Sequence, residues 1–216
     1  MSLAGLLLLV MLAAPAPMQR VRIVALGDST TAGTPGFLSP LEAPPDGRGD
    51  RTSQYAYWLM KAHPDWDVLN RGINGERSDQ IRARFERDVL DAHPAVVVLI
   101  AGVNDVYQGR PATRVIEQLR RMFERARGAG ICVVAGTIIP FNRATAGQNA
   151  GMRDVNDWIR RQSGSPGIFV ADTRSAVEAP GIPDMLSETT DQLHPTAAGY
   201  RAMAEAIRPA IEQCLR

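Results

Sequence analysis

Five short apolar runs, rich in Val and Ile and continuously rather than alternately hydrophobic, recur along this chain. Such runs are typical of strands buried on both faces, as the strands of a parallel sheet are. Amphipathic stretches with helical spacing separate them, and this alternation predicts an α/β sandwich with helices on both faces of a five-stranded parallel sheet. The predicted strands span residues 21–27, 66–72, 95–102, 131–140 and 168–173, and the predicted helices span 53–62, 78–91, 113–127, 150–161 and 196–215.

The bulk properties of the chain fit one globular domain. Its 216 residues are enough for one hydrophobic core and few for two, and the sequence contains no internal repeat or linker. The 24 basic and 23 acidic residues leave a net charge of +1, which provides no electrostatic footprint for nucleic acid. We therefore predict a single domain over residues 20–216 without a nucleic-acid partner.

Residues 1–17 form an apolar N-terminal segment. Its hydrophobic stretch, residues 3–14, is shorter than the roughly 20 residues of a membrane-spanning helix and has the length of a signal-peptide core. No Lys or Arg precedes it, however, and Pro17 lies beside the candidate cleavage site. We expect an exported protein, periplasmic or secreted, without a stable membrane span. The alternatives are a short anchor and a misassigned start codon, which would leave the protein cytoplasmic.

The two cysteines provide little information about the compartment. Cys132 lies in an apolar run, and Cys214 lies near the C-terminus. A buried thiol is the expected state of Cys132, because free cysteines behave as small apolar residues in cores. Nothing in the sequence indicates that the two cysteines meet.

Small and polar residues follow the predicted strands. Asp28 and Ser29 come directly after the first strand, and Gly72 and Asn104 lie at the ends of the second and third. In parallel α/β domains ligands bind beyond the carboxyl ends of the strands, so we expect the site at this edge. The long connection 34–50 lies nearby. Loops of this length serve as lids or rims of sites, or are mobile surface loops, and the sequence favours neither.

Ser29 needs a base to become a nucleophile, and the chain has three histidines. His63 and His93 each follow a helical stretch and precede a strand, so we expect both to be helix C-terminal caps on the far side of the sheet. His194 follows the last strand. Asp191, three residues earlier, can bind one ring nitrogen while the other faces Ser29, which would fix the tautomer of the imidazole.

The same two residues also have a simpler explanation. Asp191 and His194 can merely cap and lead into the last helix, where Pro195 suits the first helical position. A lone Asp-x-x-His pair arises often by chance, so it is a weak signal.

An acyl-transfer site also needs donors for the oxyanion, whose stabilisation is usually the largest catalytic contribution. Backbone amides and carboxamide side chains are such donors, and Gly72 and Asn104 lie where they could serve. Each also has a structural explanation, Gly72 in a tight turn and Asn104 as a loop cap. Their combination with a serine and a histidine favours catalysis.

Four ordered blocks resemble those of the GDSL, or SGNH, hydrolase family. They read GDS, NRGING, GVND and DQLHP at residues 27–29, 70–75, 102–105 and 191–195, and they span nearly all of the chain after the apolar segment. The resemblance implies a flavodoxin-like three-layer α/β/α sandwich and a serine esterase or lipase-like enzyme with no cofactor. It also implies a role for each of five residues. Ser29 would be the nucleophile and one oxyanion donor, and Gly72 and Asn104 would be the further oxyanion donors. His194 would be the base, and Asp191 would be the carboxylate that orients it.

Other positions near these blocks lie outside the catalytic set. Thr30 stands where the family name has Leu, which affects substrate fit rather than mechanism. Asp28 is expected to tie down its turn, and Asn74 and Asp105 are candidates for either a substrate contact or a turn or loop contact. The histidines are scattered, so we expect no metal site.

The residues do not specify the substrate. The resemblance allows esters of short acyl groups, among them O-acetyl groups on carbohydrate, and lipid or aryl esters. Tyr107, Phe141 and the 37–41 loop are the rim candidates. One rival is a non-catalytic carbohydrate- or lipid-binding module on the same fold. Another is a phosphate-binding loop at 27–33, which lacks the lysine and glycine spacing of a P-loop.

Overall fold

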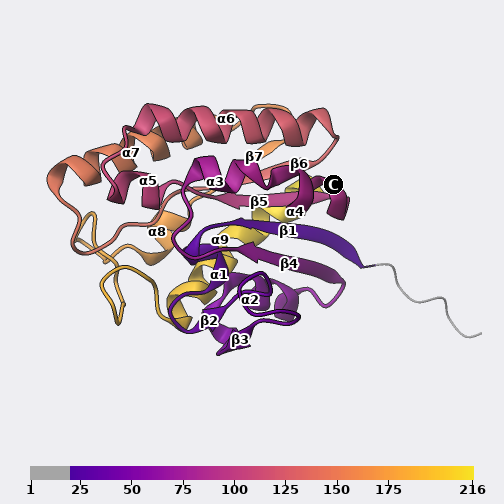
Figure 1. Ribbon diagram of the computed structural model, residues 1–216, viewed down its shortest axis with the longest axis horizontal. Helices are drawn as coiled ribbons and strands as arrows, with labels where there is room; N and C mark the ends of the chain where they lie inside the picture. The colour runs from indigo at the N-terminus through magenta and orange to yellow at the C-terminus, as the bar shows by residue number, and fades with distance from the viewer. Residues whose placement is uncertain (1–19) are drawn as a thin grey trace, which may run out of the picture.

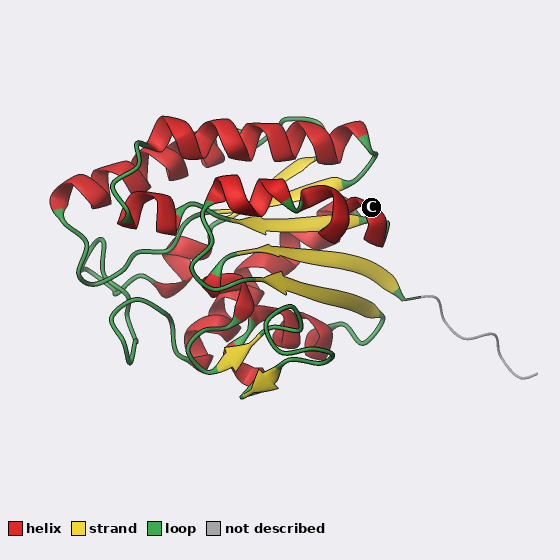
Figure 2. Ribbon diagram, viewed as in Figure 1, coloured by secondary structure: helices red, strands yellow, loops and turns green. Residues whose placement is uncertain are grey.

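The computed structural model describes residues 20–216, so the expected signal segment 1–17 lies outside the described residues. Its central five-stranded sheet has the order β4-β1-β5-β6-β7, and every neighbouring pair is parallel (Figures 1 and 2). The predicted α/β fold is thereby confirmed, and each predicted strand is present. The strands are β1 (Val21–Gly27), β4 (Trp66–Gly72), β5 (Val96–Ile100), β6 (Cys132–Gly136) and β7 (Ile168–Ala171).

Helices cover both faces of this sheet, each over its own hydrophobic core (Figure 1). One face carries α3 (Ser78–Ala83), α4 (Phe85–Asp88), α5 (Val103–Tyr107), α6 (Ala112–Gly128) and α7 (Ala146–Arg160). The other face carries α2 (Tyr55–Ala62), α8 (Thr173–Val177) and α9 (Ala197–Cys214). Within residues 20–216, no helix is both long and apolar enough to cross a membrane.

The burial of each strand follows its place in the sheet. All five residues of the central strand β5 are buried, as its continuous apolar run predicts. In the edge strand β4 only alternate residues are buried, because successive side chains point to opposite faces and the face that carries Asp67, Leu69 and Arg71 is covered less completely. The run 66–72 is therefore a half-buried edge strand, not a strand buried on both faces.

Three predicted helix boundaries are wrong. The stretch 78–91 breaks at Arg84 into α3, α4 and the 3₁₀ turn η2 (Leu90–Ala92), because the Arg84 side chain turns inward to bind main-chain carbonyls. Helix α7 begins earlier than predicted, where Thr145 caps it. Pro195 is not the first helical residue, since α9 is capped by Thr196.

The two histidines expected to be caps occupy those positions. His63 is the C-cap residue of α2 and stacks on Trp66, with ring centroids 3.9 Å apart. His93 is the C-cap residue of η2 and has a left-handed backbone conformation. Both lie before the strands, away from the carboxyl end of the sheet.

The expected free thiol at Cys132 is wrong, because Cys132 and Cys214 form a disulfide. The bond joins the start of β6 to the last residue of α9. The two cysteines are 82 residues apart, and only the packing of α9 against β6 brings them together.

Candidate active site

Ser29 begins the short helix α1 (Ser29–Ala32), immediately after the internal strand β1. Asp28 caps this helix: its Oδ1 accepts the Thr30 N–H at 3.0 Å, and its carbonyl accepts the next two amides. Because β1 lies between β4 and β5, Ser29 is placed at the point where the strand order reverses, where α/β sheets bind ligands.

Two glycines let the strand ends approach α1 closely. A Cβ atom at Gly27 would come within 2.3 Å of the Ile100 carbonyl oxygen, and one at Gly72 within 2.1 Å of the Ala32 nitrogen. Any side chain at either position would push β1, β4 or α1 apart. Apart from any catalytic role, a glycine is therefore needed at position 72 because β4 packs closely against α1 there, rather than for a tight turn.

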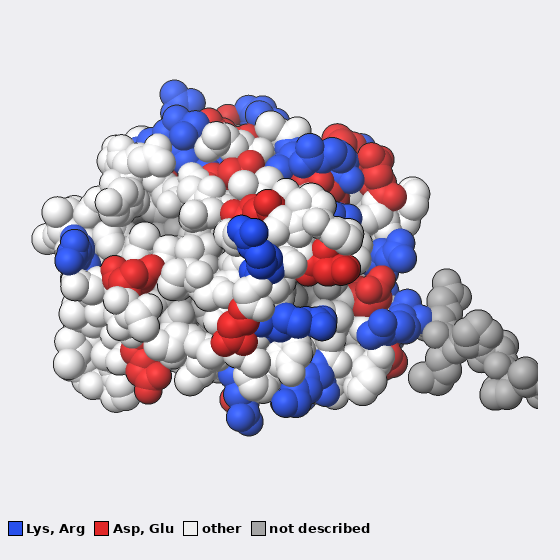
Figure 3. Space-filling view, turned by 60° about the horizontal axis from the view of Figure 1, so that its bottom comes forward, with Lys and Arg blue, Asp and Glu red and all other residues white. Residues whose placement is uncertain are grey.

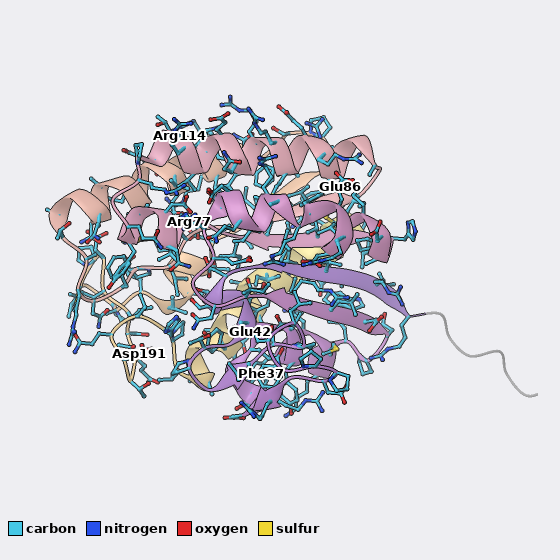
Figure 4. The ribbon with its side chains drawn as sticks, in the orientation of Figure 1. Phe37, Glu42, Arg77, Glu86, Arg114 and Asp191 are labelled. Carbon is cyan, nitrogen blue, oxygen red and sulfur yellow. A yellow bond between two sulfur atoms is a disulfide. The ribbon has the colours of Figure 1, made fainter. Side chains whose placement is uncertain are left out.

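His194 and Asp191 complete a hydrogen-bonded line to Ser29. The Nε2 atom of His194 lies 2.9 Å from Ser29 Oγ, and its Nδ1 atom lies 2.6 Å from Asp191 Oδ2. Asp191 Oδ1 also accepts the backbone amides of Leu193 and His194, at 2.9 and 2.8 Å. Asp191 lies on the loop beside the carboxyl ends of the strands (Figure 4). The spacing Asp-x-x-His thus closes a turn that aims the imidazole at Ser29.

The pKa of Asp191 lies at about 2, below its usual range. Partial burial would raise this pKa, but hydrogen bonds from the His194 ring and from the amides of His194 and Leu193 outweigh the burial. The carboxylate is therefore ionised at neutral pH and can stabilise a positive charge on the His194 ring.

The loop that carries His194 is held from both ends. Gln192 has a left-handed backbone conformation, with φ of 66°. Its carbonyl accepts the Asn142 amide at 2.8 Å, and its side chain accepts Arg143 Nε at 2.9 Å. A bridge between Thr189 and Pro195 closes the loop.

Two donors lie at the ends of β1 and β5. The Ser29 N–H has no acceptor in the described part of the chain. Asn104, in the first turn of α5, donates one Nδ2 hydrogen to the Glu76 carbonyl at 2.9 Å, and its second hydrogen has no acceptor among residues 20–216. Both groups have the chemistry that an oxyanion requires.

The amide of Gly72 is already engaged, contrary to its expected availability as an oxyanion donor. It donates to Asn70 Oδ1 at 3.0 Å. An oxyanion role for Gly72 stays a prediction that requires this bond to be exchanged. In the turn that follows, Gly75 has a positive φ of 78°, and its N–H has no acceptor among residues 20–216.

The other two candidates near the blocks differ in exposure. The Asn74 side chain is exposed, while its backbone amide donates to Glu42 Oε1 at 2.9 Å. Asp105 is buried and accepts the amide and hydroxyl of Ser78, at 2.8 and 3.0 Å. Asp105 is therefore a loop contact, and Asn74 remains a candidate for contact with a ligand.

Burial raises the pKa of Asp28 to about 7, although hydrogen bonds from Thr30 oppose the rise. The side chain is only 1% exposed, and its Oδ2 atom has no partner in the described chain. Asp28 ties down the α1 turn as expected, and near neutral pH it carries a proton for part of the time.

Sequence reasoning missed the residues that brace the site. Arg84, 7% exposed, donates to the carbonyls of Gly27 and Arg71, both at 2.9 Å, and to Glu76 Oε2 at 2.7 Å. It therefore joins the ends of β1 and β4 to the residue whose carbonyl holds Asn104. No local signal distinguishes Arg84 from the solvated arginines of the same amphipathic stretch.

The long connection 34–50 is packed against the strand ends. Ser39 Oγ donates to the Gly72 carbonyl at 2.6 Å, and Tyr200 Oη donates to the Thr34 carbonyl at 2.7 Å. The carboxylate of Glu42 binds the amides of Ser39 and Asn74, at 3.0 and 2.9 Å. The segment contains the two-stranded sheet of β2 (Phe37–Leu38) and β3 (Arg48–Gly49).

Only one of the aromatic rim candidates is accessible. Phe37 and Phe141 are buried in the interior, so the expectation that they line the rim is wrong. Tyr107, at the end of α5, is 55% exposed, and its ring packs edge-on against Phe141 with centroids 5.6 Å apart. Phe141 therefore supports Tyr107 from below.

The sequence pattern of the GDSL-like lipase/acylhydrolase family matches residues 25–202. The uncharacterized lipoprotein YqeF of Bacillus subtilis (strain 168) is 32% identical over 125 residues, which are 55% of this chain and 48% of that protein. The chain thus spans about half the length of this curated relative.

Solved structures of low sequence identity share the fold. A GDSL-like lipase from Bacteroides thetaiotaomicron superposes with a TM-score of 0.71 at 24% identity, over 94% of this chain and 92% of that one. A member of the lipolytic G-D-S-L family from Veillonella parvula gives 0.72 at 21%, over 89% and 99%. A variant of an acetyl xylan esterase from Geobacillus stearothermophilus gives 0.69 at 20%, over 90% and 97%.

Proposed function

The chain belongs to the GDSL-like lipase/acylhydrolase family, and we propose that it hydrolyses carboxylic esters through an acyl-enzyme on Ser29. The observation that carries the proposal is the hydrogen-bonded line Asp191–His194–Ser29, with bonds of 2.6 and 2.9 Å. A hydroxyl bonded to an imidazole, itself bonded to a carboxylate, is the arrangement that activates serine nucleophiles on unrelated folds.

In the first step His194 Nε2 takes the Ser29 proton as Ser29 Oγ attacks the ester carbonyl carbon. The carbonyl oxygen then carries the negative charge, which the Ser29 N–H and Asn104 Nδ2 stabilise. A third donor comes from the 72–75 turn, either the free amide of Gly75 or the amide of Gly72 after it releases Asn70. His194 returns its proton to the leaving alcohol.

In the second step water replaces the alcohol. His194 takes a proton from the water, whose oxygen attacks the acyl carbon, and the acid leaves as Ser29 regains its proton. Asp191 stays ionised throughout and stabilises the imidazolium that forms in each step. The exposed Asn74 side chain is the proposed contact with the alcohol part of the substrate.

For the substrate we propose a short acyl ester on a carbohydrate. Exposed Tyr107 supports this choice, because it lies one turn after Asn104 on α5 and offers an aromatic face of the kind on which sugar rings stack. Lipid and aryl esters are the competing substrates. Tyr107→Ala should raise KM for an acetylated oligosaccharide at least several-fold while leaving KM for a small aryl acetate unchanged.

The test of the reaction itself is active-site phosphonylation. A fluorophosphonate should label the protein at Ser29 in a one-to-one ratio, and Ser29→Ala should remove both the label and ester hydrolysis. A panel of esters from acetyl to long-chain acyl groups would then rank the substrates. Folded protein that takes up no label would instead indicate a binding module on the same fold.

We also propose that the protein is exported. The Cys132–Cys214 disulfide supports this location, because disulfides persist in oxidising compartments. The apolar segment 1–17 and the name of the lipoprotein relative agree with it. Fractionation of cells that express the full chain should recover it outside the cytoplasm, and recovery only in the cytoplasm would contradict the proposal.

A further inference from the structure

A pocket of about 530 Å³ lies between the 34–50 segment and the edge strand β4. None of Ser29, Asn104 and His194 lines it. Figure 3 brings this side of the molecule forward and shows basic side chains close together on it. We call it the arginine pocket, after the lining residues Arg48, Arg51 and Arg71.

The charges of these three arginines are not neutralised by the protein. None of them has a carboxylate within 4.0 Å among residues 20–216, whereas most other arginines of the described chain are paired. The Nε atom of Arg71 is buried and has no hydrogen-bond acceptor in the described part of the chain. Asp46 is the one acid among the residues that line the pocket. Three cations against one anion leave two positive charges.

A fourth donor comes from a side chain that is almost completely buried. Gln54 also lines the pocket and is 5% exposed. The Gly72 amide donates to Asn70 Oδ1, so Asn70 must present its Nδ2 to Gln54 Oε1, at 2.7 Å. This orientation leaves the Gln54 Nε2 group without an acceptor among the residues that the structure describes. The hydrogen-bond network therefore leaves an amide donor in a pocket that already contains three guanidinium groups.

We propose that the arginine pocket binds a phosphate monoester group. A phosphate monoester carries nearly two negative charges at neutral pH and has three terminal oxygens, which match the two uncompensated positive charges and the guanidinium and amide donors. Guanidinium groups bind such oxygens in pairs. The pocket is much larger than a phosphate, so it also accommodates part of the molecule that carries the group.

Binding is tested on the full chain by isothermal titration calorimetry with inorganic phosphate and with glycerol 3-phosphate, against sodium chloride of equal ionic strength. Vesicles of phosphatidylcholine, with and without phosphatidic acid, are tested by cosedimentation. Saturable binding of the soluble phosphates identifies a soluble ligand. Binding to the phosphatidic acid vesicles, with weak binding of both soluble probes, identifies a lipid headgroup. Absence of saturable binding to all three probes overturns the proposal.

The variants distinguish this pocket from general attraction to a charged surface. Arg71→Gln and Arg48→Gln should each weaken binding by about tenfold or more, since each removes charged hydrogen bonds. Gln54→Glu keeps the acceptor for Asn70 but replaces the donor with a negative charge, so it should abolish binding. The matched control is Arg127→Gln, which removes an exposed arginine from the end of α6 that pairs with no carboxylate among residues 20–216.

Thermal unfolding of each variant separates a loss of binding from a loss of folding. Arg48 is exposed in the short strand β3, so Arg48→Gln should unfold at the temperature of the unmodified protein and still lose affinity. Equal losses in Arg127→Gln and the pocket variants would refute the site. The measurement uses no ester substrate, so its outcome does not depend on the proposed esterase activity.

Discussion

The Oγ atom of Ser29 lies 2.9 Å from the Nε2 atom of His194, although 165 residues separate them in the sequence. Ser29 follows β1, and His194 comes from the loop before the last helix. The two therefore meet only when the whole sheet has formed. Loss of the native fold should abolish labelling of Ser29 together with hydrolysis.

Asp191→Asn should lower kcat by about a thousandfold to ten-thousandfold, because an amide holds the His194 ring in the wrong tautomer. The bond at stake is the 2.6 Å contact between Asp191 Oδ2 and His194 Nδ1. Steady-state hydrolysis of an aryl acetate measures the effect. Asp154→Asn, which changes an exposed carboxylate on α7, is the control and should have wild-type kcat.

Asn104→Ala should lower kcat by about a hundredfold to a thousandfold, the usual cost of one oxyanion donor. Asn74→Ala removes a side chain of the same type that is exposed and that we propose to contact only the alcohol part. It should change KM with little effect on kcat. Similar kcat values for the two variants would contradict the proposed role of Asn104 as an oxyanion donor.

Arg84→Lys should lower both stability and kcat. A lysine keeps the charge but cannot bind the Gly27 and Arg71 carbonyls and Glu76 at once, so the strand ends and the Asn104 acceptor lose their common support. We expect a loss of about 1–3 kcal/mol in unfolding free energy. The kcat should fall at temperatures well below unfolding, with KM nearly unchanged.

Arg87→Lys is the control for this variant. Arg87 binds the same Asp88 carboxylate as Arg84, but its side chain is 66% exposed and it reaches no strand end in the described structure. It should retain kcat. If the folded fraction of Arg84→Lys instead has the kcat of the unmodified protein, then Arg84 contributes only to stability.

Asp28→Asn should become progressively more stable than the unmodified protein as pH rises. Burial raises the pKa of Asp28 from 3.8 to about 7, so the native state binds the proton more tightly than the unfolded state. Its contribution to stability is greatest below about pH 4 and is lost as pH rises through about 7. A shift of about 3 pKa units corresponds to at most about 4 kcal/mol.

Urea unfolding of both proteins between about pH 4 and pH 8 measures this trend. Asn keeps the oxygen that accepts the Thr30 amide, so the helix cap survives the change. The control is Asp50→Asn, whose carboxylate accepts the Thr52 amide in the same way but is exposed, with its pKa lowered by hydrogen bonds from Thr52. Its trend with pH should be small and of opposite sign.

Cys214→Ser should lower the unfolding free energy by roughly 4–5 kcal/mol, because the disulfide closes a loop of 82 residues in the unfolded chain. Reduction with dithiothreitol should destabilise the unmodified protein by a similar amount and leave Cys214→Ser unchanged. Equal sensitivity of both proteins to the reductant would mean that the bond does not form.

Neighbouring residues in the sequence are enough to indicate the strands and the chemical groups at their ends. Burial on both faces leaves a continuous apolar run, as in β5, and a strand end is recognisable from the small polar residues that follow it. Neighbouring residues likewise predicted His63 and His93 as helix caps and the Asp-x-x-His spacing as a turn. These features depend on neighbours within a few residues, so the sequence shows them directly.

The tertiary fold sets which distant groups share a hydrogen-bond acceptor or lie beside a charge. The Gly72 amide is engaged by Asn70, Phe37 and Phe141 are buried, and Cys132 meets Cys214. Arg84 looks like any solvated arginine in the sequence, yet it braces the strand ends. Hydrogen bonding and desolvation depend on distances of a few ångströms between segments far apart in the chain, and the order of strands in the sheet sets those distances.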